Sequence, residues 1–405
     1  MKKFTLILSI FIFVAITVNA QWVQQNSGTL NQLVSVCFID QNTGFTVGGE
    51  GTILKTIDGG NTWVTQNSGT TYSLYAVDFL DLNNGYVVGS ICNGENPPNT
   101  TYTSIILKTT NGGNTWNIIK TFLNTSHFTD IDFISTSTGW ATSYGYIYKT
   151  IDGGINWTTC DPGYAYSSEI VFVNDNIGFV ICQIGTILKS TDGGSSWVAT
   201  SIGAADMGAL FFTDNITGYV TTINGHVWKT TNAGSTWEHV SEVDNKSLYD
   251  IFFIDSNIGY MAGDGWKIYK SSDGGLTWNI QNSGVSSKLV GIFFTDNTHG
   301  WAVGEDGTIL HTDNGGVGLT ENESEKNKFI IYPNSSNKEI TIEIIENIKP
   351  MGNECEIINI DGQIIRNIKL MKTKTQLDIS NIPSGIYFIK LLTDKSVEVK
   401  KFIKE

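Results

Sequence analysis

Short runs in which apolar and polar residues alternate recur through the first three quarters of the chain. The run VSVCF at residues 34–38 is followed by GFTVG at residues 44–48 and then by TILKT at residues 52–56. Alternation with a period of two is typical of β-strands, because successive side chains point to opposite faces of a sheet. The pattern therefore predicts a series of short consecutive strands.

The same turn motif follows every third strand. Its first copy, KTIDGGNTW, occupies residues 55–63, and the last, truncated copy is HTDNGG at residues 311–316. An Asp or Asn side chain accepts hydrogen bonds from nearby backbone amides and Gly supplies positive φ, so the motif predicts a tight hairpin turn. Because Asn replaces Asp in some copies, we expect the position to serve hydrogen-bond geometry rather than charge. The expected structural residues are Asp58, Asn111, Asp152, Asp192, Asn232, Asp273 and Asn314.

A tryptophan ends each intact copy and opens a fourth strand. Successive tryptophans stand 53, 41, 40, 40 and 41 residues apart. Four strands in each unit of about 40 residues, repeated seven times, predict an all-β, seven-bladed β-propeller over residues 21–318. The segment WVQQNSG from Trp22 resembles WVTQNSG from Trp63 but has no turn motif before it, and the last motif lacks its tryptophan. We therefore expect the Trp22 strand to complete the last blade and close the ring.

The loops of such a blade divide between two faces. With strands named A to D from the axis outwards, the A–B and C–D turns share one face, and the B–C and D–A connections share the other. The irregular interval of 53 residues arises from an insertion between strands B and C of the second blade, at Ser90 to Ser104. Variable loops on a fixed scaffold are common binding elements, so the insertion points to the B–C and D–A face.

The two ends of the chain have a different character from the repeats. Residues 1–20 contain two lysines, an apolar run and a small-residue cleavage pattern, which predict a secretory signal peptide. Residues 319–328 are polar and charged and predict a linker. Residues 329–405 show alternating apolar runs separated by Pro and Gly turns, which predict a small Ig-like β-sandwich.

Charge and cysteine content narrow the possible partners. Residues 21–318 hold 10 Lys and 26 Asp or Glu, a net charge of −16, which disfavours nucleic acid and anionic lipid. No apolar run after the signal peptide reaches membrane-spanning length, and we expect a monomer. We expect no structural disulfide, metal or cofactor, because the cysteines fall on different predicted blades and in the last domain and no two Cys or His have ligand spacing. The cysteines are Cys37, Cys92, Cys160, Cys182 and Cys355.

The seven turn motifs resemble the Asp-box, or bacterial neuraminidase repeat. The whole repeat resembles that of the photosystem II stability and assembly factor family, over residues 21–318, which implies the propeller fold. Such repeats also occur in sialidases, glycosidases and sorting receptors, so the likeness does not identify a function. A sialidase would need several arginines to hold a carboxylate, whereas Arg366 is the chain's single arginine.

The last domain resembles the type A sorting domain of the type IX secretion system of Bacteroidetes. The resemblance rests on Tyr332-Pro333-Asn334, Asp361-Gly362, the LDIS segment from Leu377, the PSGIYF segment from Pro383 and the KKFIK segment from Lys400. Ser335 stands where a second proline is common. The resemblance implies that the secretion machinery binds residues 329–405, that the domain is removed, and that the protein reaches the cell surface or the medium.

Candidate binding residues gather at the predicted channel mouth on the B–C and D–A face. Acids occupy the second position of strand A in three blades, as Asp130, Glu169 and Asp250. The same face is expected to carry aromatic side chains that could stack on a sugar or hold a cation. These residues are His127, Tyr102, Tyr164, Tyr166 and Trp266.

Three functions are compatible with this pattern. The first is a surface or secreted propeller, without enzymatic activity, that binds a protein or a glycan. The second is a polysaccharide-active glycoside hydrolase, which needs two opposed carboxylates at a suitable separation. The third is an architectural surface component without a discrete ligand. The sequence contains no distinct catalytic constellation, so we expect a binding module.

Overall fold

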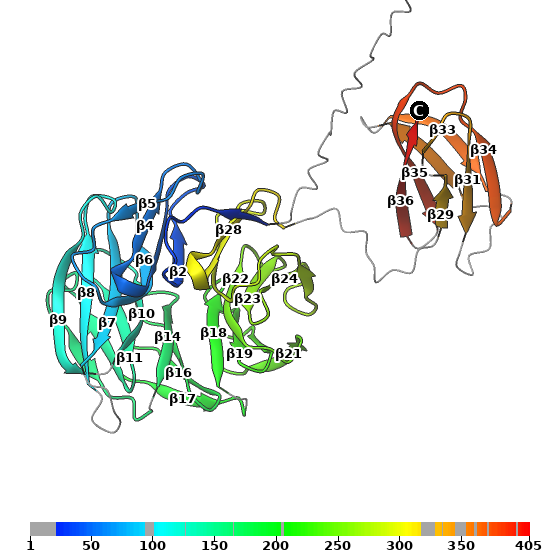
Figure 1. The fold of residues 1–405 in the computed structure, drawn as a ribbon. Helices are drawn as coiled ribbons and strands as arrows, with labels where there is room; N and C mark the ends of the chain where they lie inside the picture. The colour runs from blue at the N-terminus through cyan, green and yellow to red at the C-terminus, as the bar shows by residue number, and fades with distance from the viewer. Residues whose placement is uncertain are drawn as a thin grey trace, which may run out of the picture. The chain divides into compact units, whose positions relative to one another are not determined.

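The computed structural model describes most of the chain as two compact units, residues 1–318 and residues 319–405 (Figure 1). The described residues are 22–93, 101–125, 127–164, 166–203, 206–316, 329–333, 335–344, 354–359, 363–370, 372–393 and 396–405. The expected signal peptide, the expected linker and the middle of the insertion, residues 94–100, lie outside them.

The first unit is a ring of seven four-stranded antiparallel sheets, which confirms the predicted all-β propeller. Blade 1 contains β2 (Leu33–Phe38), β3 (Gly44–Gly48), β4 (Ile53–Thr56) and β5 (Val64–Gln66). Blade 2 contains β6 (Ser73–Phe79), β7 (Gly85–Cys92), β8 (Tyr102–Thr109) and β9 (Asn117–Thr125). Blade 3 contains β10 (Phe128–Phe133), β11 (Gly139–Ser143), β12 (Tyr146–Thr150) and β13 (Thr158–Cys160). Blade 4 contains β14 (Ser167–Phe172), β15 (Gly178–Cys182), β16 (Thr186–Ser190) and β17 (Val198–Ser201). Blade 5 contains β18 (Met207–Phe212), β19 (Gly218–Thr222), β20 (His226–Thr230) and β21 (Glu238–Glu242). Blade 6 contains β22 (Leu248–Phe253), β23 (Gly259–Gly263), β24 (Lys267–Ser271) and β25 (Asn279–Gln281). Blade 7 contains β26 (Leu289–Phe294), β27 (Gly300–Gly304), β28 (Ile309–Thr312) and β1 (Val23–Gln25).

The two ends of the propeller segment meet in blade 7. Strand β1 pairs antiparallel with β28, with Val23 opposite His311 and Gln25 opposite Ile309. Trp22, which precedes β1, is 1% exposed and meets Phe294 edge to face, with 5.7 Å between ring centroids. Strand β1, the first strand of the described residues, therefore joins the last blade of the ring through both backbone pairing and core packing.

Aromatic stacking between neighbouring blades holds the ring together. The Phe that ends each strand A stacks on an aromatic residue near the start of strand B in the preceding blade. In three examples the ring centroids are 3.5 Å apart for Phe38 and Trp301, 3.5 Å for Phe133 and Tyr86, and 3.4 Å for Phe172 and Trp140. The remaining four stacks follow the same pattern, so the repeat builds a continuous aromatic belt between the blades.

Hydrogen bonds within the C–D turn explain the repeated Asp or Asn. Asp58 Oδ1 accepts hydrogen bonds from the Thr62 amide at 2.8 Å and the Thr56 hydroxyl at 2.9 Å, and the Thr62 hydroxyl donates to Oδ2 at 2.7 Å. In blade 2, Asn111 Oδ1 accepts from the Thr115 amide, whereas Asn111 Nδ2 donates to the Thr115 hydroxyl at 2.9 Å. A threonine hydroxyl can donate or accept, so Asp and Asn are interchangeable here.

The turns divide between two faces of the propeller. Every C–D turn bonds to the A–B turn of its own blade, as when the Gly59 amide donates to the Asn42 carbonyl at 3.0 Å and the Gly153 amide donates to the Ser137 carbonyl at 2.8 Å. On the opposite face, the Gly49 amide in the B–C turn η1 (Gly49–Gly51) donates to the carbonyl of Gln32, in the D–A connection. The same arrangement recurs at η2 (Glu305–Gly307). We call the B–C and D–A side the loop face.

The second unit is built from two small sheets. The three-stranded sheet is β29 (Phe329–Tyr332), β31 (Glu339–Ile344) and β34 (Lys374–Asp378). The five-stranded sheet is β30 (Ser335–Ser336), β36 (Ser396–Lys404), β35 (Gly385–Thr393), β32 (Glu354–Asn359) and β33 (Ile364–Lys369). Phe329 and Ile340 from one sheet and Ile389 and Phe402 from the other belong to one buried cluster, so the sheets share a core.

Candidate functional site

Blade 2 departs from the repeat by extending toward the loop face. Strands β7, β8 and β9 contain eight, eight and nine residues, whereas the equivalent strands of blade 1 contain five, four and three. The extra pairing runs to Cys92 opposite Tyr102, beyond which the Asn93 amide donates to the Thr101 carbonyl at 2.8 Å. The insertion thus lengthens the B–C hairpin and carries Tyr102 beyond the level at which the other blades turn.

Five aromatic side chains from blades 2 to 4 form a contiguous group on the loop face, which we call the tyrosine cluster. Its members are Tyr75, Tyr102, His127, Tyr144 and Tyr166. The centroid of the His127 ring lies 4.5 Å from that of Tyr75, 5.6 Å from that of Tyr102 and 4.6 Å from that of Tyr144. The Tyr166 ring extends the group, 4.8 Å from Tyr144. Rings distant in sequence therefore form one continuous aromatic surface.

Several different elements position these rings. Tyr75 lies on the inner strand β6 and Tyr102 on the extended strand β8. His127 directly precedes β10, Tyr144 lies in the turn between β11 and β12, and Tyr166 directly precedes β14. Tyr144 is 39% exposed and Tyr166 is 45% exposed, while the other three are half-buried.

Three members of this cluster, Tyr102, His127 and Tyr166, were predicted from the sequence, whereas Tyr75 and Tyr144 were not. The available signal was position in the repeat. Tyr75 is the first residue of the repeated strand A segment, and Tyr144 lies in a B–C connection, so both belong to the end of the blade at the loop face. Side-chain contacts between blades could not be read from the repeat alone.

His127 is a neutral residue at the centre of the cluster. Burial lowers the pKa of its imidazole to about 4. Its Nδ1 atom is buried and has no hydrogen-bond partner within the described part of the chain. The cluster consequently offers aromatic faces, phenol hydroxyls and an uncharged imidazole at neutral pH.

Two of the predicted aromatic residues stand apart from the cluster. Tyr164 is 40% exposed, and Trp266 in blade 6 is 52% exposed. Within the described part of the chain, neither ring packs against another aromatic ring. Trp266 has a φ of 53°, at a turn position where blades 1 and 3 carry Gly51 and Gly145.

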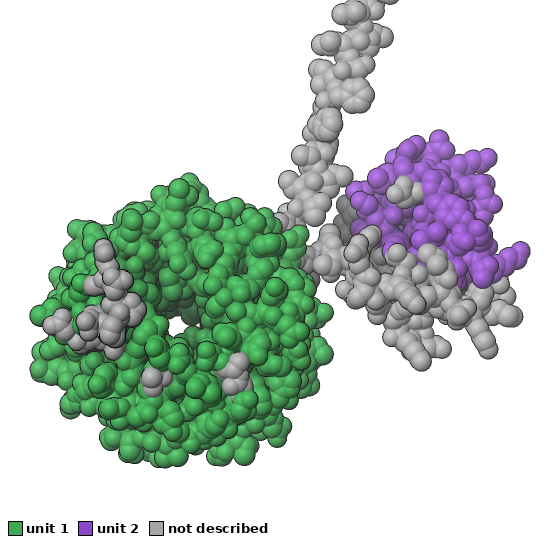
Figure 2. Space-filling view, turned by 60° about the horizontal axis from the view of Figure 1, so that its bottom comes forward, with its two compact units in different colours: residues 1–318 green, residues 319–405 purple. Residues whose placement is uncertain are grey.

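The three predicted acids line the central channel, whose opening is visible in Figure 2. Asp130 Oδ2 accepts a hydrogen bond from the Ile170 amide at 2.9 Å, and Asp250 Oδ2 accepts one from the Ile292 amide at 2.7 Å. Glu169 Oε2 accepts a hydrogen bond from the Leu210 amide. In each case the donor belongs to the next blade, so each acid links two inner strands.

Two further channel acids were not predicted from the sequence: Asp132, two positions after Asp130 on β10, and Asp78 on the inner strand β6. Asp78 accepts a hydrogen bond from the Phe133 amide at 2.8 Å, and Asp132 accepts one from the Phe172 amide. Burial raises the pKa of Asp78 to about 6 and that of Asp130 and Asp250 to about 7. Burial also raises the pKa of Asp132 and Glu169 well above their ordinary values.

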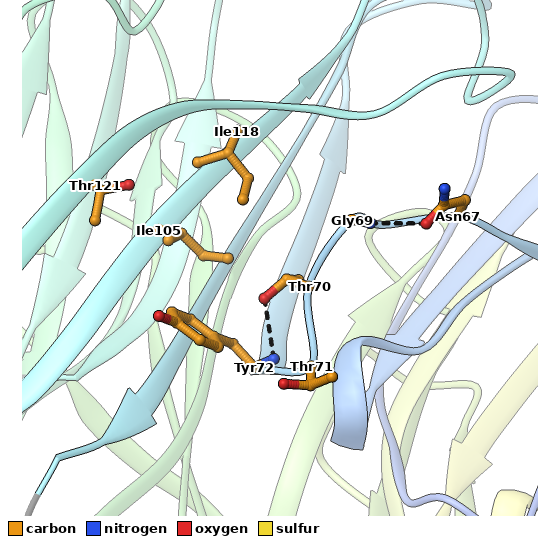
Figure 3. Close-up of a pocket in the computed structure, with 8 residues that line it drawn as sticks. All are labelled: Asn67, Gly69, Thr70, Thr71, Tyr72, Ile105, Ile118 and Thr121. Carbon is orange, nitrogen blue, oxygen red and sulfur yellow. Dashed lines mark hydrogen bonds between the residues drawn. The ribbon is translucent and has the colours of Figure 1, made fainter.

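A pocket of about 480 Å³ lies between the D–A connection that joins blades 1 and 2 and the outer strands of blade 2 (Figure 3). The Gly69 amide bonds to Asn67 Oδ1 at 3.0 Å and the Tyr72 amide to Thr70 Oγ1 at 3.1 Å. A similar pocket of about 510 Å³ lies one repeat earlier, beside residues 28–31. Because the pocket recurs with the repeat, we interpret it as a feature of the propeller scaffold rather than as a specific binding site. Its lining residues are Asn67, Gly69, Thr70, Thr71, Tyr72, Ile105, Ile118 and Thr121.

The described residues contain neither a cluster of metal ligands nor a membrane-spanning helix. Within them, His, Cys, Asp and Glu form no group of three or more that could hold a metal ion. None of the described segments forms a helix that is long and apolar enough to cross a membrane.

Comparison with known sequence families confirms both resemblances. The family described as photosynthesis system II assembly factor YCF48 matches residues 14–163, 114–244 and 235–321. The secretion system C-terminal sorting domain matches residues 330–405. No functionally curated relative matches the sequence.

Comparison with solved structures agrees on the fold. YCF48 from Cyanidioschyzon merolae is 22% identical, with a TM-score of 0.60 over 72% of this chain and 98% of that one. A structure described as YCF48 bound to D1 peptide is 21% identical, with a TM-score of 0.59 over 72% and 96%. PorZ, a surface component of the type IX secretion system of Porphyromonas gingivalis, is 14% identical, with a TM-score of 0.52 over 90% of this chain and 58% of that one. These likenesses show the fold alone.

Proposed function

Because the chain belongs to the photosynthesis system II assembly factor YCF48 family and ends in a type IX secretion sorting domain, we propose that it is an exported binding protein whose ligand docks on the loop face of the propeller. The sorting domain directs secretion across the outer membrane to the cell surface or the medium. In this proposal residues 1–20 direct passage through the inner membrane, and residues 329–405 engage the secretion machinery and are then removed.

The observation that carries the proposal is the coincidence of two irregular features. The insertion extends blade 2 toward the loop face, and the tyrosine cluster lies against that extension. Neither feature is required by the repeat, because other neighbouring blades form the same aromatic stacks without an insertion or a tyrosine cluster. Exposed aromatic rings on a rigid frame are typical anchors of binding surfaces.

The channel acids form the floor of the proposed face. Asp130, Glu169 and Asp250 lie at the third position of strands β10, β14 and β22, near the ends of these strands at the loop face. Trp266 and Tyr164 add exposed aromatic surface on the same side. The solved YCF48 with a bound D1 peptide supports the idea that a propeller of this shape can serve as a binding frame.

The alternative of a glycoside hydrolase has less support. A catalytic pair needs one carboxyl to donate a proton and another to act as base or nucleophile. Asp130 and Asp250 both accept two backbone amides, one from the following residue and one from the next blade. Those bonds account for the acids without any catalytic role.

A comparison of the two faces tests the proposal. Residues 94–100 would be replaced by Asn-Gly in the full chain, while Ile57→Ser and Ile151→Ser would alter exposed residues of the C–D turns on the opposite face. Binding to immobilised cell-envelope protein and polysaccharide fractions would be measured for each variant. We expect the first variant to lose binding and the second to retain it. Equal binding by both variants would contradict the proposed face.

A further inference from the structure

We propose that the tyrosine cluster is a binding site for an uncharged glycan, whose hexopyranose rings stack on the tyrosine rings. This inference rests on the proposed function and names the ligand class for its binding face.

Ring geometry is the first argument. The centroids of successive rings, from Tyr75 through His127 and Tyr144 to Tyr166, lie 4.5, 4.6 and 4.8 Å apart. Their planes are inclined to one another by 59° to 79°, so the surface is curved and presents both faces and edges. The C–H groups of a hexopyranose carry partial positive charge and are attracted to the negative face of an aromatic ring.

Exposure and backbone conformation supply the second argument. Tyr144 and Tyr166 are the most exposed members of the cluster. Tyr144 packs on the half-buried His127, which also contacts the half-buried Tyr75 and Tyr102. Tyr166 has a φ of 61°, in the left-handed region that aromatic residues seldom adopt. Such a conformation costs on the order of 1 kcal/mol or more, and residues that retain it cluster at functional sites.

Charge supplies the third argument. Among the described residues, no member of the cluster takes part in an ion pair or a cation–π contact. The surrounding propeller carries a net charge of −16, which repels a polyanionic glycan. The cluster itself presents no carboxylate to pair with a cationic ligand. Phenol hydroxyls and a neutral imidazole suit the hydroxyl groups of an uncharged sugar.

Strand pairing argues against an extended peptide as the ligand. A peptide that adds as a strand needs an open sheet edge. Strand β8, which carries Tyr102, pairs with β7 on one side and β9 on the other. Tyr144 lies in a turn and Tyr166 in a connection, so neither belongs to such an edge.

The test is a titration of the full chain with oligosaccharides. Cellohexaose, mannohexaose and laminarihexaose serve as neutral probes, hexagalacturonate as the anionic probe, and a library of short peptides as the third probe. We expect saturable binding of at least one neutral hexaose. Tyr144→Ala and Tyr166→Ala should each weaken it about tenfold, equivalent to about 1.4 kcal/mol, while Tyr144→Phe should keep most of it.

Tyr332→Ala is the matched control, because Tyr332 is also 39% exposed but lies in the second unit. It should leave binding unchanged. Preference for hexagalacturonate, binding of peptide but no hexaose, or hexaose binding that the cluster variants do not alter would overturn the glycan assignment. If the Asn-Gly replacement at residues 94–100 still abolished binding to envelope material, the proposed function would survive that failure. If that replacement had no effect and no probe bound, both the proposed function and the glycan assignment would be wrong.

Discussion

Asp130 in blade 3 accepts a 2.9 Å hydrogen bond at Oδ2 from the backbone amide of Ile170 in blade 4. Equivalent bonds join Glu169 to Leu210 and Asp250 to Ile292. The inner strands of adjacent blades belong to separate sheets, so their facing amides lack a strand partner, and an unpaired buried amide would cost about 1–3 kcal/mol. The channel acids supply the missing acceptors.

The channel acids should make the protein more stable at mildly acidic pH than at alkaline pH. Burial raises the folded-state pKa of Asp78, Asp130 and Asp250 above the value of about 4 expected in the unfolded chain. Between about pH 4 and 7 the folded protein therefore binds more protons than the unfolded chain, and stability falls as the pH rises through this window. His127 and His311 act in the opposite sense, because burial lowers their pKa.

The substitution Asp132→Asn isolates the effect of one acid. Asn can still accept the hydrogen bond from the Phe172 amide through Oδ1 but cannot ionise. We expect the variant to be more stable than wild type at pH 8, by a margin that shrinks as the pH falls toward about 4, measured by chemical denaturation. A variant less stable than wild type at pH 8 would show that the acid is needed in its charged form.

The C–D turn should tolerate an amide but not a methyl group at its key position. Asp273 accepts hydrogen bonds from the Thr277 amide at 2.9 Å, the Thr277 hydroxyl at 2.6 Å and the Ser271 hydroxyl at 2.8 Å. Asp273→Asn should change the free energy of unfolding by less than about 0.5 kcal/mol, because Asn111 already occupies the equivalent position. Asp273→Ala should cost about 1–2 kcal/mol. Equal effects of the two changes in thermal denaturation would contradict this account.

Trp266 adds exposed aromatic surface to the loop face but should reduce the stability of the propeller. Its φ of 53° suits glycine, and its side chain is 52% exposed, so Trp266→Gly should stabilise the propeller by about 1 kcal/mol. Gly145→Ala is the reverse change, since a Cβ at that position would meet nothing within 4 Å and only the φ of 90° opposes it. We expect it to destabilise the propeller by a similar amount. A loss of stability in Trp266→Gly would indicate that the indole is needed for packing.

Trp22 should be essential for closing the ring. The residue is 1% exposed and packs against Phe294 beside the pairing of β1 with β28. Trp22→Ala should reduce the free energy of unfolding by about 3–5 kcal/mol, and Trp22→Phe by much less. A loss below about 1 kcal/mol in Trp22→Ala would mean that the first strand contributes little to the last blade.

Much of the propeller could be predicted because several separate sequence signals coincide in each repeat. The alternating strands, the Asp or Asn turn and the returning tryptophan all indicate one blade of about 40 residues. Strand β33 (Ile364–Lys369) in the second unit was not predicted, because the segment IIRNIK lacks strict alternation and its residues are largely exposed. The short strand β30 (Ser335–Ser336) is too polar to give a signal.

The candidate site was only partly predictable. Their positions in the repeat predicted that Tyr102, His127 and Tyr166 lie on one face of the propeller. Whether these side chains contact one another depends on the rotation of each blade relative to the next. That geometry places Tyr144 between His127 and Tyr166, and Tyr75 against His127. The bonds from Asp130 and Glu169 to the following blades were also invisible in the sequence, because the donors are backbone amides and carry no residue signature.

Hydroxyl-radical footprinting of the full chain, with and without bound cell-envelope material, tests the central claim most directly. The claim is that the loop face binds the ligand. Oxidation of Tyr144, Tyr166 and Trp266 should fall on binding, while Ile57 and Ile151 on the opposite face and Tyr332 in the second unit should be oxidised as in the free protein. Protection of Ile57 and Ile151, with Tyr144 and Tyr166 unchanged, would contradict the account.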